Sequence, residues 1–156
     1  MIRPPDIKED ARRAFEVLKA GGIALLPADV GYFLATCNSQ GLEKIFKGKK
    51  RGAHKRHPTI GTLEFERELH IMEPYQAEIV KTLTQDLGLP LAVVAKYNAN
   101  HPMIKDIDAE RLEASTSNGT IYMAVNAGAF TDELTRLAHA ENILLQGSSA
   151  NPTGTG

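Results

Sequence analysis

The C-terminal residues of the chain combine the chemical groups that bind phosphate. Segment 146–155 follows an apolar run at 143–145 and supplies the hydroxyls of Ser148 and Ser149, the amide of Asn151 and several small residues. Small residues let the backbone approach a ligand closely, and hydroxyl, amide and backbone N–H donors match phosphate oxygens. We therefore expect this segment to form part of a phosphate-binding site.

A basic segment far upstream supplies the positive charge that the C-terminal segment lacks. Residues 47–57 hold six of the 18 Lys and Arg residues of the chain. Lysine binds phosphate as a point charge, whereas arginine offers a bidentate fork. The alternative is a solvated helix end, where the helix dipole favours cations. Gly48, Gly52 and Pro58 favour a shaped loop, so the two segments together indicate a site for a phosphorylated nucleotide.

Other common catalytic patterns are absent from the sequence. His54 and His57 are three residues apart, but their segment contains no Cys or acidic residue and its cations repel a metal ion. We therefore expect no transition-metal site, although Mg²⁺ bound to nucleotide phosphates is compatible with the segment. There is no Walker loop, no G-x-G-x-x-G and no G-x-S-x-G, and nothing marks Ser149 and His139 as a nucleophile and its base.

The turn after the first apolar run offers two further polar side chains. Asp29 and Tyr32 follow the run at 23–26, at the place where α/β sheets commonly position ligand-binding loops. They either orient a polar ligand or are a turn aspartate and a half-buried tyrosine. The sequence leaves both interpretations open.

Alternating helical and strand-like patterns must position these residues. A capping box at Asp6 begins a helix, and Pro74 and Thr131 mark the starts of two others. The sequence predicts helices around 7–18, 42–46, 75–87 and 131–137, and strands around 23–26, 59–63, 91–95, 121–125 and 143–145. Residues 101–115 show no clear period. Strands that alternate with helices indicate an α/β domain.

Composition sets the class of protein. The 156 residues are 42% hydrophobic and 24% charged, which is typical of one globular domain over residues 1–156. The net charge of −1 argues against a protein that coats nucleic acid along its whole surface. Cys37 is the single cysteine, which excludes an internal disulfide, and no apolar run approaches the roughly 20 residues needed to cross a bilayer. We expect a cytoplasmic protein without a membrane partner.

Four segments, in order, resemble motifs of the YrdC/YciO family, whose best-known members are threonylcarbamoyl-AMP synthases. Residues 148–154 match S/T-S-A-N-x-S/T-G, and 44–58 resemble K-I/L-F/Y…K-x-R-x…P. Residues 21–35 resemble G-G…P-T-D-T-x-Y-G-L-A, and 88–92 resemble P-G-P-x-T. The resemblance covers nearly the whole chain. It implies a YrdC-like single domain with a twisted mixed β-sheet flanked by helices.

The resemblance also implies an activity. Family members are nucleotidyltransferases that join threonine, bicarbonate and ATP into threonylcarbamoyl-AMP for tRNA modification, and we therefore expect ATP as a substrate, accompanied by Mg²⁺. On this basis the nucleotide and its phosphates are bound by Lys49, Arg51, Ser148, Ser149 and Asn151. Lys49 and Arg51 then act as catalytic cations. This reaction requires no protein nucleophile, in agreement with the absence of a recognisable nucleophile and base from the sequence.

The part of the site that would bind the small substrate rather than the nucleotide, called here the small-substrate side, departs from the family motifs. The positions expected there are Ala28, Asp29, Tyr32, Phe33, Ala92 and Asn126. Hydroxyls of the family motifs are lost at Ala28, Val30 and Ala92, and Phe33 puts a ring where the family has glycine. Asn126 stands where the family has arginine. Because a buried polar partner contributes about 1–3 kcal/mol, we expect a changed substrate, a small amino acid or related acyl group, or a loss of activity.

Two alternatives remain open from the sequence. The first is a non-catalytic RNA- or nucleotide-binding module in which Lys50, Lys55 and Arg56 contact RNA. The absence of aromatic residues between positions 47 and 57, which would stack on bases, counts against it. The second is a degenerate paralogue kept for protein contacts. The family usually continues beyond the S-A-N motif, so we also expect a fragment or a shortened relative.

Overall fold

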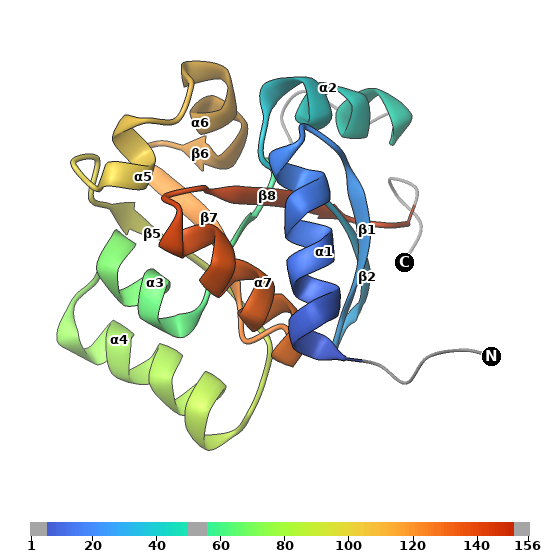
Figure 1. Ribbon diagram of the computed structural model, residues 1–156. Helices are drawn as coiled ribbons and strands as arrows, with labels where there is room; N and C mark the ends of the chain where they lie inside the picture. The colour runs from blue at the N-terminus through green and yellow to red at the C-terminus, as the bar shows by residue number, and fades with distance from the viewer. Residues whose placement is uncertain (1–5, 50–55, 152–156) are drawn as a thin grey trace.

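A mixed β-sheet runs through the molecule, with helices packed along it (Figure 1). The computed structural model describes residues 6–49 and 56–151. Within them, eight strands form one sheet in the order β1-β2-β8-β3-β7-β5-β4, and β6 also pairs with β7. Only β3 and β7 run parallel among these described pairs. The predicted α/β fold, a mixed sheet flanked by helices, is confirmed.

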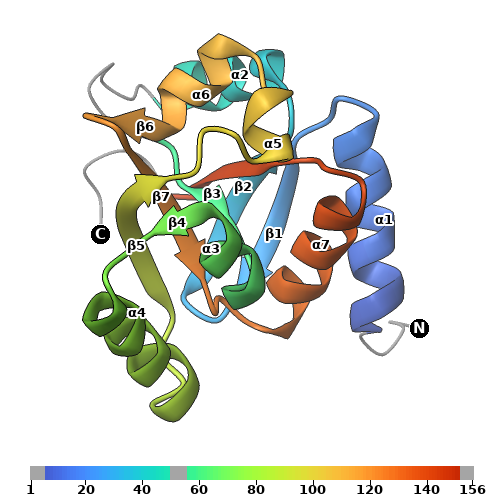
Figure 2. The same ribbon diagram turned by 90° about the vertical axis from the view of Figure 1, so that its left-hand side faces the viewer.

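The strands are mostly short. Their bounds are β1 (Ala24–Ala28), β2 (Gly31–Thr36), β3 (Thr59–Ile60), β4 (His70–Ile71), β5 (Leu91–Tyr97), β6 (Thr116–Ser117), β7 (Thr120–Val125) and β8 (Leu145–Ser149). The helices are α1 (Ile7–Lys19), α2 (Ser39–Gly48), α3 (Leu63–Leu69), α4 (Pro74–Lys81), α5 (Pro102–Lys105), α6 (Ala109–Ser115) and α7 (Ala129–Ala140). A π-helical turn, η1 (Thr82–Asp86), extends α4. Figure 2 shows α4 projecting from the body of the molecule beside β5.

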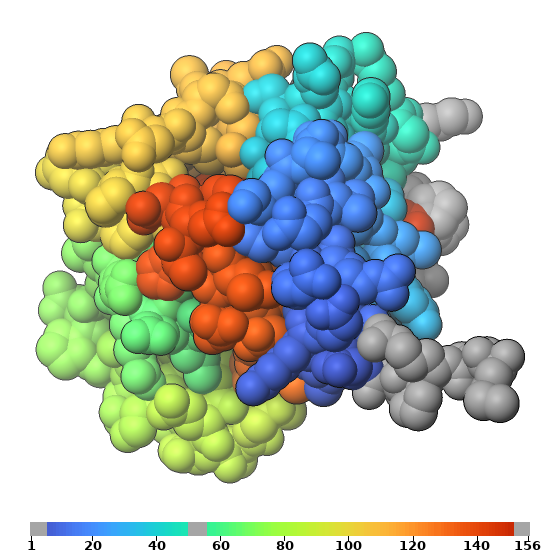
Figure 3. All heavy atoms as spheres, in the orientation of Figure 1, coloured from blue at the N-terminus to red at the C-terminus, as the bar shows by residue number. Residues whose placement is uncertain are grey.

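Two hydrophobic clusters hold the helices to the sheet. One cluster joins α1 and α7 to β1, β2, β3 and β8, and Phe15, Leu18 and Leu134 are among its fully buried members. The other cluster centres on Phe65 of α3 and Met123 of β7. Figure 3 shows α1 and α7 side by side over one face of the molecule. Both clusters fix the strand ends at which the candidate site lies.

The predicted ends of helices and strands agree with the structure at some positions and differ from it at others. Asp6 caps α1 as predicted, because its carboxylate accepts a hydrogen bond from the Glu9 N–H. The strand predicted over 59–63 is wrong beyond Ile60, since Thr62 caps α3, which begins one residue later. The predicted cap at Thr131 is also wrong. Helix α7 already begins at Ala129, with Gly128 as its N-cap.

Two segments without a strand or helix prediction are ordered. Residues 31–36 form β2, which pairs with β1 in a hairpin closed by Ala28 and Gly31. Gly31 adopts a φ of 125°, a conformation that side-chain-bearing residues rarely adopt. Residues 101–115, which show no clear period, contain α5 and α6. The first turn after β1 is therefore a tight hairpin.

Among the described residues, no helix combines the length and apolar composition needed to cross a bilayer.

Candidate active site

Lys49 lies at the C-terminal end of α2 and reaches the end of β8. Its backbone N–H donates to the Ile45 carbonyl, which continues the helical pattern by one residue. Its Nζ lies 3.0 Å from Ser148 Oγ and 3.2 Å from Ser149 Oγ, and it also donates to the Ser149 carbonyl. Lys49 is only 9% exposed. The structure thus brings a buried ammonium group to the two serines predicted to bind phosphate.

These two serines also border a small pocket. Its volume is about 170 Å³. The lining residues are Ala28, Val30, Gly31, Tyr32, Phe33, Pro58, Ile60, Ala124, Ala127, Thr131, Gly147, Ser148 and Ser149. We call this cavity the hairpin pocket, because the β1–β2 hairpin supplies five of its residues. Three residues predicted for the small-substrate side, Ala28, Tyr32 and Phe33, are among them.

Asp29, also predicted for that side, faces α7 instead. It does not line the hairpin pocket. Its backbone N–H donates to the Ala127 carbonyl, and its carboxylate packs against Gly128, the N-cap of α7. The N-terminal end of a helix favours a negative charge. Asp132 in the first turn of α7 has a raised pKa, first because it is partly buried and second because the Asp29 charge is near.

Of the two remaining residues predicted for the small-substrate side, Ala92 lies on β5 and Asn126 directly follows β7. Ala92 pairs with Ala124 of the hairpin pocket, but its own side chain lines a separate groove of about 690 Å³ between β5 and α4. Asn126 has a φ of 55°, and its amide donates to the carbonyls of Thr84 at 3.2 Å and Leu89 at 2.9 Å. Asn126 therefore fixes the connection between η1 and β5. Neither residue lines the hairpin pocket.

A second hollow lies on the other side of Lys49. Its volume is about 350 Å³, and it is lined by Lys49, Asn151 and Lys44, among others. Asn151 is exposed there. The predicted phosphate ligands Lys49, Ser148, Ser149 and Asn151 are therefore gathered at the end of β8. Arg51, Lys50 and Lys55 lie outside the described residues, and Arg56 is half-buried within them.

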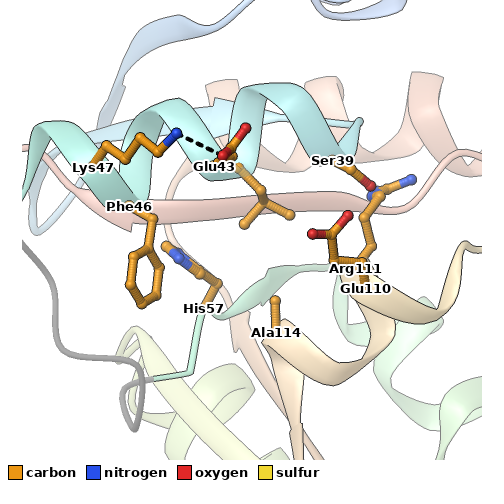
Figure 4. Close-up of a pocket in the computed structure, with 9 residues that line it drawn as sticks. Ser39, Glu43, Phe46, Lys47, His57, Glu110, Arg111 and Ala114 are labelled. Carbon is orange, nitrogen blue, oxygen red and sulfur yellow. Dashed lines mark ion pairs between the residues drawn. The ribbon is translucent and has the colours of Figure 1, made fainter.

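A third cavity, of about 220 Å³, lies between α2 and α6 (Figure 4). His57 and Phe46 line it with their rings 5.7 Å apart, and Lys47 forms an ion pair with Glu43 at its edge. His57 Nδ1 donates to the Gly147 carbonyl at 3.2 Å, so this ring braces β8. Among the described residues, none of the predicted phosphate ligands lines this cavity.

One described group has the composition of a metal site. Glu68, His101 and His139 place one ligand atom each within 4.8 Å of one another. Glu68 Oε2 lies 3.5 Å from His101 Nε2 and 3.2 Å from His139 Nε2. His101 Nδ1 accepts a hydrogen bond from the Met103 N–H, so the neutral ring carries its proton on Nε2. Glu68 Oε2 thus lies between the Nε2 atoms of the two imidazoles, and the absence of a transition metal stays a prediction.

The sequence interpretation missed several residues of the hairpin pocket. Ile60 comes from β3, Ala124 from β7, Ala127 from the connection between β7 and α7, and Thr131 from the first turn of α7. They look like ordinary core residues, because alternation along a strand marks a covered face without showing whether protein or ligand covers it. Helical spacing does not predict the nearness of Ala127 and Thr131, because Ala127 precedes Gly128, the N-cap of α7.

The chain resembles known proteins in structure rather than in sequence. No protein-family model matches the sequence, and no curated protein matches it in sequence. The structure of a hypothetical protein from Streptococcus mutans UA159 aligns with a TM-score of 0.79 and 26% identity, over 90% of this chain and 56% of that one. The chain thus spans little more than half of that protein.

Two further solved structures, of Sua5 and of YciO, resemble this one. P. abyssi Sua5 complexed with L-threonine aligns with a TM-score of 0.69 and 19% identity, over 99% of this chain and 42% of that one. E. coli YciO aligns with a TM-score of 0.68 and 16% identity, over 97% of this chain and 68% of that one. Both are YrdC-family structures. The resemblance seen in the sequence motifs is confirmed at the level of the fold, which is YrdC-like.

Proposed function

We propose that this chain binds an ATP-type nucleotide beside Lys49 and uses it to form an acyl- or carbamoyl-adenylate. The observation that carries this proposal is the buried Lys49 ammonium group, held by Ser148 and Ser149 at the edge of the hairpin pocket. A desolvated, fixed cation next to a pocket of about 170 Å³ suits a reaction between a phosphate and a small molecule. The YrdC-like fold supports the same reaction class.

The chemistry requires positioning and charge rather than a protein nucleophile. A carboxylate or carbamate oxygen attacks the α-phosphorus of ATP, the bond to the bridging oxygen breaks, and pyrophosphate leaves with both electrons of that bond. Negative charge accumulates on the phosphate oxygens, where Lys49 supplies a cation and the Ser148 and Ser149 hydroxyls can donate. Mg²⁺ enters with ATP as part of the substrate. Arg51 is proposed as a second cation on the strength of the K-x-R motif.

The small substrate is proposed to occupy the hairpin pocket. Ala28, Tyr32 and Phe33 line this pocket together with the two serines that contact Lys49. The Sua5 structure is complexed with L-threonine, so a small amino acid, with bicarbonate, is the first substrate class to test. We extend the proposal to a role in tRNA modification, for which the adenylate would be the activated intermediate.

The test is ATP–pyrophosphate exchange, with detection of the AMP adduct by mass spectrometry, over a panel of amino acids with bicarbonate. Lys49→Met should abolish exchange. Lys47→Met is the matched control, because Lys47 is an exposed lysine of the same helix and pairs with Glu43. Exchange should survive that change.

Failure to form an adduct with any substrate, in a chain that is folded by circular dichroism, would refute the catalytic proposal. Binding of RNA with a steep dependence on salt, without adduct formation, would favour the RNA-binding module instead. Lys49→Met would then weaken binding only modestly, since one of several cations is lost.

A further inference from the structure

The walls of the hairpin pocket are apolar except at one end. Its side chains include the rings of Phe33 and Pro58 and the aliphatic groups of Val30, Ile60 and Ala124. No charged side chain is among the described residues that line it. The polar end is formed by Ser148 and Ser149, beside Lys49, and the only other side-chain hydroxyls among the described lining residues are those of Thr131 and the exposed Tyr32. A ligand that fits must therefore have one polar head and one apolar body.

Of the hydroxyls that line the pocket, those of Thr131, Ser148 and Ser149 have partners within the protein, and the remaining one belongs to Tyr32, which is 65% exposed. Thr131 is 1% exposed, and its Oγ1 lies 3.5 Å from each of the carbonyls of Pro27 and Ala127, so its single proton can be donated to either one of them. Ser148 Oγ and Ser149 Oγ accept from Lys49 at the polar end. A hydroxyl on the apolar body of a ligand would lose its water partners and meet carbon atoms instead.

Pocket size limits the apolar body further. An apolar cavity of roughly 150 Å³ accommodates a benzene molecule, so about 170 Å³ matches a small branched side chain with its head group. Next to Gly147, which lines the pocket, the space is filled by protein, because an added Cβ would meet the Leu34 carbonyl at 2.8 Å and Ile60 at 3.0 Å.

We infer that the hairpin pocket selects a small aliphatic amino acid or its carbamate, of the size of valine, over the hydroxyl-bearing threonine. This inference rests on the proposed function, according to which the ligand of the hairpin pocket is the acyl substrate. Valine and threonine are isosteres that differ by one methyl and one hydroxyl group. An apolar pocket discriminates such a pair by about 10- to 100-fold.

The experiment compares valine with threonine in two independent readouts on the 156-residue chain. The first is the kcat/KM ratio in ATP–pyrophosphate exchange with bicarbonate. The second is direct binding of each amino acid, measured by calorimetry or ligand-observed NMR with a non-hydrolysable ATP analogue present. We expect valine to be favoured by about tenfold or more in both readouts.

The two readouts separate the two proposals. Preferential binding of valine without exchange supports the inference and refutes the catalytic proposal. Exchange with threonine equal to or better than valine refutes the inference and supports catalysis. Absence of binding for both amino acids up to about 10 mM overturns the inference.

A hydroxyl added to the pocket wall provides the matched variant. Val30→Thr and Ala28→Ser place hydroxyls on residues that line the pocket, so each should reduce the preference for valine several-fold. Val17→Thr makes the same isosteric change on α1, where Val17 is 49% exposed and does not line the pocket. Its valine-to-threonine ratio should equal that of the unchanged protein. An unchanged ratio in both pocket variants would place the amino acid elsewhere.

Discussion

Lys49 Nζ lies 3.0 Å from Ser148 Oγ, and this contact joins the end of α2 to the end of β8 across 99 positions of sequence. The same ammonium group also contacts Ser149. Because Ser148 and Ser149 line the hairpin pocket, one cation is linked to both the proposed phosphate site and the proposed acyl site. Changes at this contact should therefore affect stability and ligand binding together.

The two serines should differ in their contribution to stability. Ser148 is 2% exposed, whereas Ser149 is exposed. Ser148→Ala removes a buried acceptor from a cation and should lower the free energy of unfolding by about 1–3 kcal/mol. Ser149→Ala should lower it by less than about 1 kcal/mol, because water replaces the lost hydroxyl. Urea unfolding of both variants measures the difference, and equal losses would contradict the assignment of Ser148 as the buried partner.

Asp132 should make the stability of the protein depend on pH. Its folded-state pKa lies above the ordinary value of 3.8, first because of burial and second because of the Asp29 charge. The folded state therefore binds this proton more tightly than the unfolded chain, so the contribution of Asp132 is lost as pH rises from about 3.8 through its raised value. Asp132→Asn should be more stable than the unchanged protein at pH 7.

The same stabilisation should disappear below about pH 3.8, where Asp132 is protonated in both states. Thermal unfolding of the two proteins at pH 3 and pH 7 measures it. Asp29→Asn is the companion variant, because it removes one cause of the shift and should lower the pKa of Asp132 in an NMR titration. A pKa that stays unchanged in this variant would show that burial alone raises it.

Arg111 should be important for stability rather than for binding. Its Nε donates to Gln146 Oε1 at 2.8 Å, and its guanidinium also donates to the Leu144 carbonyl at 2.6 Å. Burial lowers the pKa of this group. Arg111→Met leaves the buried Gln146 and Leu144 oxygens without these donors, so it should destabilise the fold by about 2–4 kcal/mol.

Arg136→Met is the control for that change. Arg136 pairs with Glu133 on the surface of α7, and its side chain is 61% exposed. An exposed pair contributes about 0–1 kcal/mol, so this variant should unfold at nearly the same urea concentration as the unchanged protein. Similar losses for Arg111→Met and Arg136→Met would mean that the buried hydrogen bonds of Arg111 contribute little.

Local sequence signals predicted the elements whose ends they determine. The Asp6 cap predicted the start of α1, and the apolar run at 91–95 predicted most of β5. The start of α7 was misplaced because Gly128, rather than a polar residue, is its N-cap and the Asp29 carboxylate from a distant hairpin lies there. A carboxylate that is brought to a helix end from elsewhere in the chain leaves no signal in the helix sequence.

The candidate site was predictable only in part. Residue chemistry indicated phosphate binding by Lys49, Ser148 and Ser149, but no spacing rule places residues so far apart in contact. The family resemblance supplied that expectation. Asn126 was assigned to the substrate side, yet its amide binds two backbone carbonyls. Only the three-dimensional structure distinguishes such a bracing amide from one that faces a ligand.

Phe33 should set the size of the substrate. Its ring lines the hairpin pocket and packs at the edge of the α1–α7 cluster. Phe33→Ala should enlarge the cavity, shift the preferred amino acid from valine toward leucine or isoleucine, and destabilise the fold by about 1–3 kcal/mol. Phe46→Ala is the control, because Phe46 lines the separate cavity between α2 and α6. That variant should keep the size preference of the unchanged protein in exchange and binding assays. A shift toward leucine in Phe46→Ala but not in Phe33→Ala would move the acyl site to the α2–α6 cavity.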